Sequence, residues 1–257
     1  MEPDLENFRL SKSAIITYLN CPYNFQLTYV KKKPQLKPEP DSPLQIGTDV
    51  HGLFEQFYKD ERAKNIQPPY DEAIREIMME HKGAEKYSNF IENFINFNLR
   101  MIEDNGIENY LPIEVESKLY DPELNFVGII DCVYDTPDGV VILDFKTGKP
   151  KPITENRLEL LLYKVLYLKT KKVEAKYGGI YYPRTDTFRM ARFLKPGEEA
   201  GEKETVLTID DEFEALASLD EVRERISKKH FPPKPGFLCN FCSYGKNGTN
   251  ICKLEGI

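Results

Sequence analysis

The sequence predicts an α/β fold with a helical N-terminal portion. Three observations support this class. Helical periodicity dominates residues 10–104, period-two alternation replaces it between residues 113 and 147, and an amphipathic helix at residues 155–170 precedes two more strand-like segments. Helices, a meander of strands, a helix and further strands in this order are typical of a sheet covered by helices.

The helical portion is expected to contain four helices, at residues 10–30, 47–60, 70–81 and 84–104. Ser11 or Ser13 is expected to cap the first helix and Thr48 the second, because a side-chain oxygen there accepts a bond from an unpaired backbone N–H. Residues 31–43 contain four prolines and four lysines, which predicts a loop.

Five strands are expected, at residues 113–121, 126–136, 139–147, 177–184 and 187–194. Pro137, Asp138 and Gly139 predict a turn between the second and third strands. A last helix is expected at residues 210–229, before an irregular, cysteine-rich tail. We therefore predict one domain over residues 1–257, with a helical portion (1–110), a core (111–230) and a tail (231–257) that closes on Cys21.

Composition and charge narrow the class of protein. With 40% hydrophobic residues the chain can fill a core, which argues against disorder. The net charge of −7 does not itself indicate nucleic-acid binding, but a local basic groove is compatible with it, and Lys31–Lys33 and Lys149 are candidates. No apolar run approaches the roughly 18 residues of a membrane span. The acidic N-terminus lacks an apolar signal core, so we expect a cytoplasmic protein.

Two acids and a lysine lie at the ends of neighbouring strands. The apolar run over residues 140–143 ends in Asp144 and Lys146, which share one face of the strand, and Asp131 lies on the strand before. A hairpin would bring the two carboxylates together, where they repel unless a divalent cation binds both. Carboxylate oxygens suit Mg²⁺ or Mn²⁺, and a lysine beside the metal suits phosphodiester hydrolysis. The alternative is a simple ion pair between Asp144 and Lys146.

The same residues resemble a known family. Gly128-Ile-Ile-Asp131 followed by Asp144-Phe-Lys-Thr-Gly148 resembles the PD-(D/E)XK nuclease superfamily in its RecB-like branch. The resemblance implies a restriction-endonuclease-like core, with a mixed central sheet flanked by helices. It implies that Asp131 and Asp144 bind the metal, with the main-chain carbonyl of Phe145, and that Lys146 is the catalytic lysine. His51, on the second helix, would be a further metal ligand, although a helical histidine is often structural.

Three further residues have two interpretations each. Tyr163 matches the tyrosine of the family's Gln-x-x-x-Tyr helix, which implies a catalytic or DNA-positioning role, but Glu159 stands where the family usually has glutamine. Glu159 is therefore either a DNA-positioning residue or part of a polar helix face. Glu116 is either an accessory residue of the metal site or a solvent-facing strand carboxylate.

Four cysteines form an unusual pattern, with Cys21 near the N-terminus and Cys239, Cys242 and Cys252 near the C-terminus. A Cys-x-x-Cys pair binds zinc or an iron–sulfur cluster, or acts in redox chemistry. The pattern resembles the 4Fe–4S staple of AddB-type helicase–nucleases and of CRISPR-associated and phage RecB-like nucleases. Zinc is the alternative. Cys132 is interpreted as a buried small hydrophobic residue.

Together these features predict a metal-dependent DNA exonuclease or endonuclease that acts on single strands or duplex ends. An inactive, nuclease-like scaffold subunit of a repair, recombination or CRISPR adaptation complex is the main alternative. The resemblance implies a helicase, an annealing protein or a CRISPR adaptation protein as the partner. A redox protein is the weakest hypothesis because it leaves Asp131, Asp144 and Lys146 without a role.

Overall fold

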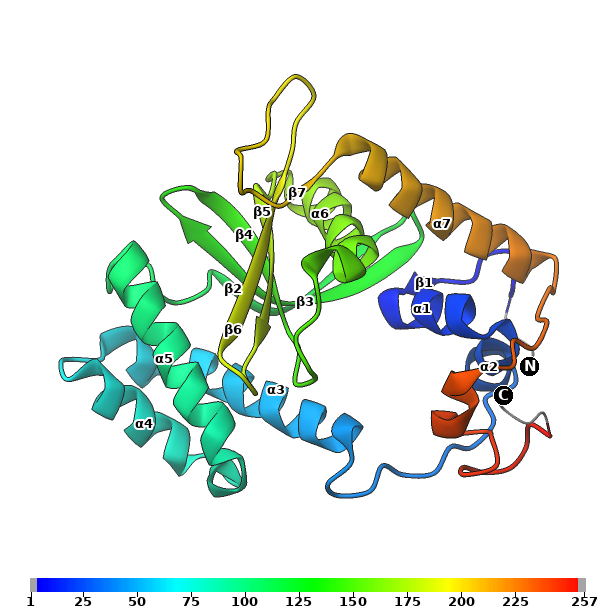
Figure 1. Cartoon of the computed structure of the whole chain (residues 1–257), viewed down its shortest axis with the longest axis horizontal. Coiled ribbons are helices and arrows are strands. Elements are labelled where there is room, and N and C mark those ends of the chain that lie inside the picture. Colours follow the sequence, from blue (N-terminus) through cyan, green and yellow to red (C-terminus); the bar gives the residue numbers. More distant parts are fainter. Residues whose placement is uncertain (1–3, 254–257) are drawn as a thin grey trace. The chain divides into compact units, whose positions relative to one another are not determined.

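A computed structural model describes residues 4–253 of the chain (Figure 1). These residues cluster into two compact units. Unit 1 is built from residues 4–38, Tyr120–Gly128 and 213–253. Unit 2 is built from Glu39–Leu119 and Ile129–Glu212. Both units are therefore assembled from segments that are distant in the sequence.

The fold is mixed α/β with a helical N-terminal part and a mixed, curled sheet, as predicted. The strands are β1 (Leu10–Ser11), β2 (Glu114–Asp121), β3 (Phe126–Thr136), β4 (Gly139–Phe145), β5 (Tyr177–Tyr182), β6 (Thr187–Phe193) and β7 (Val206–Leu207). They are ordered β1-β3-β4-β5-β6-β7, and β2 also pairs with β3. Strand β4 is antiparallel to β3 and parallel to β5, so the carboxyl ends of β4 and β5 lie side by side.

The α-helices are α1 (Lys12–Asn20), α2 (Pro22–Phe25), α3 (Pro43–Lys59), α4 (Tyr70–Glu80), α5 (Ser88–Asn105), α6 (Arg157–Lys171) and α7 (Ile209–Ser227). Short helical turns are η1 (Gln26–Val30), η2 (Glu61–Asn65), η3 (Ala84–Tyr87), η4 (Ile153–Asn156) and η5 (Phe237–Phe241). Among the described residues, none of these helices combines the length and apolarity that crossing a bilayer requires.

The prediction of one continuous helix over residues 10–30 is wrong. Ser11 caps α1 as expected, but the helix stops at Cys21, whose backbone is extended with φ −160° and ψ 103°. The cause is Pro22, because a proline ring disfavours helical geometry in the residue before it. The chain then resumes as α2, with Pro22 at its first turn, and ends in the π-helical turn η1.

Helix α3 begins four residues earlier than the predicted start at residue 47. Its N-cap is Ser42, whose hydroxyl accepts a bond from the Gln45 N–H at 3.3 Å, and Pro43 occupies the first turn. A serine followed by proline is a favourable helix start, because proline lacks the N–H that would stay unpaired there. Thr48 is inside the helix, where its hydroxyl donates to the Leu44 carbonyl, so its predicted capping role is wrong.

The other boundaries differ from prediction by a few residues. The helix expected at 84–104 begins with η3 and becomes regular at Ser88. Strand β5 ends before Pro183, which cannot donate to the sheet. Strands β1 and β7 were not predicted, because two residues are too few to show alternation.

Aromatic side chains fill the core of unit 2 between α3, α5 and one face of the sheet. The Phe54 and Phe94 rings stack with centroids 4.0 Å apart, and Phe145 of β4 meets Phe54 edge to face at 5.2 Å. Cys132 lies in the same cluster and is 1% exposed, as its interpretation as a small hydrophobic residue requires. This core fixes α3 against the ends of β3 and β4.

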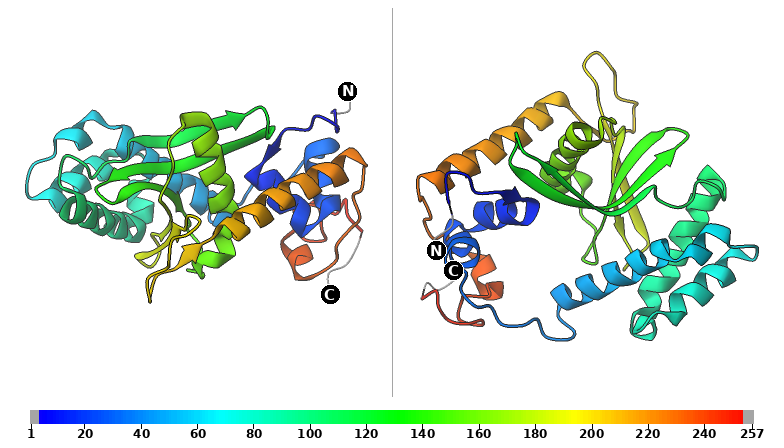
Figure 2. Two further views of the ribbon diagram at one scale, coloured as in Figure 1. Left: turned by 90° about the horizontal axis from the view of Figure 1, so that it is seen from above. Right: turned by 180° about the vertical axis from the view of Figure 1, so that it is seen from behind.

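Helix α6 packs against β4 and β5, and Figures 1 and 2 show it lying along these strands. Ile142 pairs with Gly178 across the two strands, and both alternate with residues of the aromatic core. Gly178 is required here, because a Cβ atom would lie 2.8 Å from the Phe193 ring and 3.2 Å from Leu160. The close approach of α6 brings Glu159 toward the end of β4.

A buried hydrogen bond connects α3 to β3. The hydroxyls of Tyr58 and Tyr134 lie 2.8 Å apart, and the exposed fractions of these residues are 6% and 1%. Tyr58 is two turns beyond His51 on α3, and Tyr134 is three residues beyond Asp131 on β3. The bond therefore fixes the two elements that carry these candidate site residues.

We expect either Tyr58→Phe or Tyr134→Phe to lower the free energy of unfolding by about 1–2 kcal/mol, because one buried hydroxyl loses its partner. The double variant should lose less than the sum of the single variants, since it leaves neither hydroxyl unpaired. Urea unfolding of the four proteins measures this coupling. Strictly additive losses would show that the bond contributes nothing.

Candidate active site

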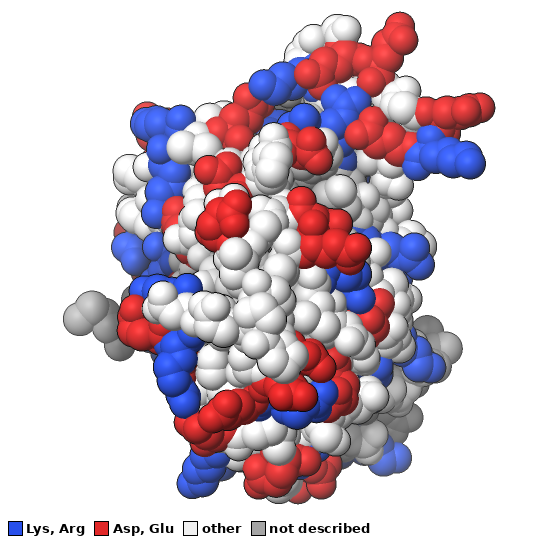
Figure 3. Space-filling view, turned by 90° about the vertical axis from the view of Figure 1, so that its left-hand side faces the viewer, with Lys and Arg blue, Asp and Glu red and all other residues white. Residues whose placement is uncertain are grey.

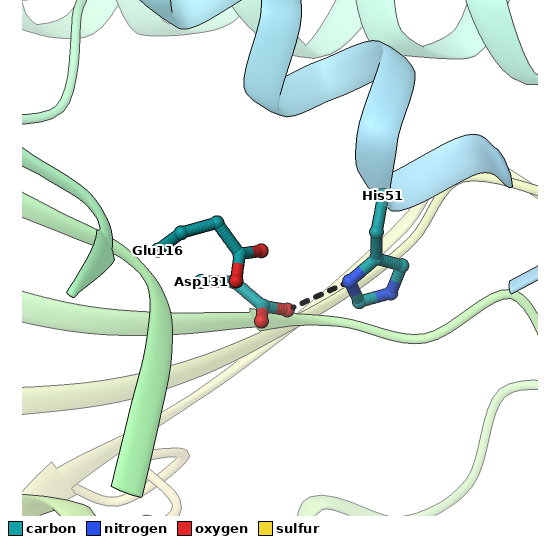
Figure 4. Close-up of side chains that lie close together, drawn as sticks. All are labelled: His51, Glu116 and Asp131. Carbon is teal, nitrogen blue, oxygen red and sulfur yellow. Dashed lines mark ion pairs between the residues drawn. The ribbon is translucent and has the colours of Figure 1, made fainter. Parts of the chain in front are cut away.

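Three side chains that can bind a metal converge in unit 2 from three elements (Figure 4). His51 comes from α3, Glu116 from β2 and Asp131 from β3, and one ligand atom from each lies within 4.8 Å of the others. His51 Nδ1 lies 3.4 Å from Asp131 Oδ2. Among the described residues, this is the only group of three or more such side chains that meets this spacing.

His51 is held at the edge of the aromatic core. Its ring meets Phe145 edge to face, with centroids 6.1 Å apart and planes at 87°. Its side chain is 28% exposed, so one part of the ring is packed while the rest is accessible. Phe54, one turn further along α3, packs on the same Phe145 ring. The orientation of His51 therefore follows from the packing of α3.

Asp131 is fixed by a main-chain bond. Its Oδ2 accepts a hydrogen bond from the Phe145 N–H at 2.7 Å, and the residue is 9% exposed. The ladder of β3 and β4 pairs Cys132 with Leu143, so Asp131 and Asp144 occupy the next positions along the two strands. This is the hairpin proximity of the two acids that the sequence predicts.

Glu116 reaches the group through unusual backbone geometry. Its φ of 48° lies in the left-handed region, which a residue in a strand rarely adopts. Such a residue interrupts the alternation of the strand and redirects the side chain. Figure 4 shows its carboxylate turned toward Asp131. Of the two interpretations that the sequence left open, the structure favours the one in which Glu116 joins the metal site.

The electrostatics and geometry of this group suit a cation. Burial, and then the negative charges of Asp131 and Glu116, raise the pKa of the Cys132 thiol well above its ordinary value. A divalent ion would neutralise that charge. Ligands about 2.1 Å from an octahedral ion lie roughly 3 Å apart when adjacent and roughly 4 Å apart when opposite. The spacing of the three side chains therefore fits Mg²⁺ or Mn²⁺ without large movement.

A second charged cluster lies at the end of β4. Lys146 Nζ is 2.6 Å from Asp144 Oδ2 and 2.9 Å from Glu159 Oε1. Asp144 is 1% exposed and Glu159 is 5% exposed, so one half-buried ammonium neutralises two buried carboxylates. The predicted alternative of an Asp144–Lys146 ion pair is thus present in the structure. It exists beside the metal-ligand group rather than in place of it.

The contact with Lys146 explains the acid at position 159. A carboxylate near a phosphate-binding site is unfavourable unless a cation balances it, and Lys146 supplies that balance. Glu159 is therefore not merely part of a polar helix face, because it is buried against the sheet. A glutamine here would hydrogen-bond to the same ammonium but leave it with a higher net charge.

The other predicted site residues are less directly placed. Tyr163 is buried on α6 with 2% exposure, so any effect on bound DNA would pass through its neighbours. Phe145 directs its ring into the core, and its carbonyl at the end of β4 remains a predicted ligand. Lys149 is exposed in the loop after β4.

The four cysteines outside the sheet lie together in unit 1. Cys21, Cys239, Cys242 and Cys252 all line one cavity between α1, α2 and the tail. Within residues 4–253, however, no three of their sulfurs lie within 4.8 Å of one another. Four thiolates about 2.3 Å from one zinc ion would lie roughly 4 Å apart. The structure therefore does not show a cluster or zinc site, and the sulfur spacing does not support one.

The surface charge is mixed rather than strongly basic. Figure 3 shows one face of the molecule, on which acidic and basic side chains are interspersed around uncharged residues. Many of these charges are paired, as in Arg75–Glu92 and Arg62–Glu80. Nucleic-acid binding would therefore depend on particular cations near the site and not on the average field.

A sheet with metal-ligating acids at the ends of adjacent strands, followed by lysine, defines a class of metal-dependent phosphodiesterase folds. The chain belongs to the PD-(D/E)XK nuclease superfamily, whose family model matches residues 9–247. This match confirms the fold and the superfamily that the sequence motifs predict.

The chain is also similar to parts of much longer proteins. Over 159 residues it is 26% identical to a subunit of the ATP-dependent helicase/deoxyribonuclease of Streptococcus uberis, covering 57% of this chain and 14% of that protein. Over 133 residues it is 29% identical to a subunit of the ATP-dependent helicase/nuclease of Thermoanaerobacter sp. strain X514, covering 44% and 11%. The helicase/nuclease of Clostridium botulinum strain 657 includes a similar chain, 30% identical over 139 residues, covering 46% and 11%. The chain thus aligns with about one eighth of each relative.

We expect Glu116→Gln to weaken Mn²⁺ binding by about 10- to 100-fold, because it removes one negative ligand while keeping the side-chain shape. Titration calorimetry with Mn²⁺ measures the change. Glu103→Gln on α5, an exposed residue of the same unit, is the charge-matched control. Equal Mn²⁺ affinities for wild type and Glu116→Gln would remove Glu116 from the site.

Proposed function

We propose that the chain is a metal-dependent DNA nuclease that hydrolyses phosphodiester bonds, acting as an exonuclease at DNA ends. The observation that carries the proposal is the His51–Glu116–Asp131 group next to the Asp144–Lys146 pair, in a chain of the PD-(D/E)XK superfamily. One nitrogen and several carboxylate oxygens form a ligand set for Mg²⁺ or Mn²⁺. Asp144 and the Phe145 carbonyl are proposed to complete it.

A bound divalent ion supplies a more acidic water and neutralises charge that develops on the phosphate. The protein residues supply position. Asp131 is held by the Phe145 N–H and His51 by the Phe145 ring, so both are ordered before substrate binds. Such preorganisation reduces the reorganisation needed in the transition state.

Lys146 is proposed to be the catalytic lysine. Its ammonium, at the end of β4, orients the attacking water and stabilises the negative charge on the phosphate oxygens. Glu159 and Asp144 hold the ammonium on two sides, which limits its rotation. Tyr163 is proposed to support this arrangement from within α6.

The proposed substrate is DNA, as single strands or duplex ends. The relatives are named as components of helicase/nucleases, which supports a helicase as the proposed partner. An annealing protein or a CRISPR adaptation protein are the other partners that the sequence motifs suggest. Lys149 is proposed to contact backbone phosphates, which predicts strong dependence of binding on salt.

End-labelled single-stranded and duplex DNA tests the proposal. Wild-type protein should shorten one or both of these substrates with Mg²⁺ or Mn²⁺ and should stop when EDTA is added. Asp144→Ala should leave no detectable cleavage under the same conditions. Absence of cleavage with either metal, or full activity in Asp144→Ala, would favour the inactive scaffold role instead.

We further propose that Cys21, Cys239, Cys242 and Cys252 hold a 4Fe–4S cluster, with zinc as the alternative. Their common cavity and their Cys-x-x-Cys pattern support this. Binding would have to draw Cys21 and the tail closer together. The cluster would be structural, since it would join segments more than 200 residues apart and restrict the unfolded chain.

Anaerobically purified protein should be brown and contain iron, and Cys239→Ser should lose both the colour and thermal stability. Metal analysis and visible absorption measure this, with Ser243→Ala in the same tail as the control. Colourless protein with stoichiometric zinc would support the alternative, and protein without either metal would refute both.

A further inference from the structure

Arg184 follows the end of β5 and lies beside the candidate active site. Its Nε donates a hydrogen bond to the carbonyl oxygen of Thr147 at 2.9 Å. Thr147 comes directly after Lys146, whose own N–H donates to the Tyr181 carbonyl at 2.9 Å. Because β4 and β5 are parallel, Lys146 and Arg184 leave the sheet at the same edge.

Thr147 also relates Arg184 to the metal-ligand group. A Cβ atom on Gly47 would lie 3.4 Å from the Thr147 hydroxyl, so this loop closely approaches α3. Gly47 is one turn before His51 on that helix. Arg184 is therefore attached to a loop that contacts both the lysine and the histidine elements of the site.

The position of Arg184 is preorganised. Its guanidinium carbon lies 5.3 Å from the centre of the Phe90 ring on α5, within the range of a cation–π contact. The backbone is fixed as well. The Asn93 amide donates to the Pro183 carbonyl at 2.8 Å, and the Asn89 amide donates to the Arg184 carbonyl at 3.2 Å.

The charge of Arg184 is not balanced by an acid in the described part of the chain. The only side-chain hydrogen bond it makes there is the one from Nε, and it forms no ion pair with those residues. Arg100, by contrast, is paired with Asp186, and Lys151 is paired with Glu155. Arg184 is exposed, so its two terminal nitrogens, with four N–H donors, are accessible to a ligand.

We propose that Arg184 binds a backbone phosphate of the DNA strand next to the bond that is cut. The inference rests on the proposed nuclease function and adds a substrate-binding residue to it. A guanidinium presents paired donors that match two phosphate oxygens, and a stacked, hydrogen-bonded guanidinium loses little freedom on binding. The contact would position the strand without reading its sequence.

The test measures DNA binding without cleavage. Fluorescence anisotropy with a labelled single-stranded oligonucleotide, in Ca²⁺ in place of Mg²⁺, gives Kd between about 50 and 200 mM salt. Arg184→Gln should raise Kd by about tenfold and reduce the slope of log Kd against log salt by about one. Arg184→Lys should keep the slope, because it keeps the charge, but bind more weakly than wild type. Lys203→Gln, an exposed lysine of unit 2, is the matched control.

The inference fails if Arg184→Gln retains the wild-type Kd and salt slope, or if Lys203→Gln changes them equally. It also fails if wild type binds no DNA. Thermal unfolding of each variant shows whether a loss of binding reflects a loss of fold, and Arg184→Lys provides a second variant with the charge intact. Asp144→Ala separates the two proposals, because it should bind DNA like wild type while cutting none. Binding that depends on Arg184 in a protein without nuclease activity would leave this inference standing and refute the proposed function.

Discussion

Replacing Lys146 by methionine is expected both to abolish cleavage and to destabilise the protein. The ammonium contacts Asp144 at 2.6 Å and Glu159 at 2.9 Å, and both acids are almost fully buried. Removing one member of a buried ion pair leaves an uncompensated charge, which lowers stability by about 3–5 kcal/mol. We expect a loss of about 3 kcal/mol here, because the lysine itself is partly exposed. Cleavage should fall by at least about 100-fold.

A second variant separates the structural role from the catalytic one. Lys146→Met combined with Glu159→Gln removes one of the two unbalanced acids, so it should recover part of the lost stability. It should recover none of the activity, because the lysine is still absent. Chemical unfolding and single-turnover cleavage give the two quantities. If activity returned together with stability, Lys146 would be a structural residue only.

Replacing Asp131 by asparagine is expected to remove metal binding while keeping the fold. The amide oxygen of asparagine can still accept the Phe145 N–H, so the end of the hairpin stays intact. The lost charge should weaken Mn²⁺ binding by more than about 100-fold, because even the outer partners of metal ligands contribute about 10- to 100-fold. Cleavage should fall by at least the same factor at low metal concentration.

Asp135→Asn is the matched control for this experiment. Asp135 lies four residues further along β3, on the same strand, and is exposed. It should bind Mn²⁺ like wild type. Mn²⁺ titration and urea unfolding are measured on all three proteins. An Asp131→Asn protein that folds and binds Mn²⁺ with unchanged affinity would contradict the metal site.

The sequence predicted the main elements of unit 2 because local patterns determine them. The alternation of apolar residues over residues 126–136 and 139–147, with a turn at Gly139, sets the β3–β4 hairpin. That hairpin in turn places Asp131 beside Asp144. Proline had two opposite effects on the helices: Pro22 interrupts a predicted helix, whereas Pro43 begins one in a segment predicted as a loop.

The parts of the site that were not predictable depend on tertiary structure. The positive φ of Glu116 cannot be read from the local pattern, which is that of an ordinary strand. Arg184 carries no local signal, because its role depends on β5 lying next to β4. The contact of Glu159 with Lys146 likewise requires α6 to pack on the sheet. Sequence motifs identified the individual acids and the lysine, but not which of them share contacts.

The discontinuous chain of unit 2 has a consequence for protein synthesis. His51 is made 80 residues before Asp131. At about 5–20 residues per second, helix α3 waits roughly 4–16 s for the strand that completes its ligand group. Strand β5, which pairs with β4 and leads to Arg184, is made later still. A ribosome-bound chain therefore cannot assemble the candidate active site until more than half of the sequence has been translated.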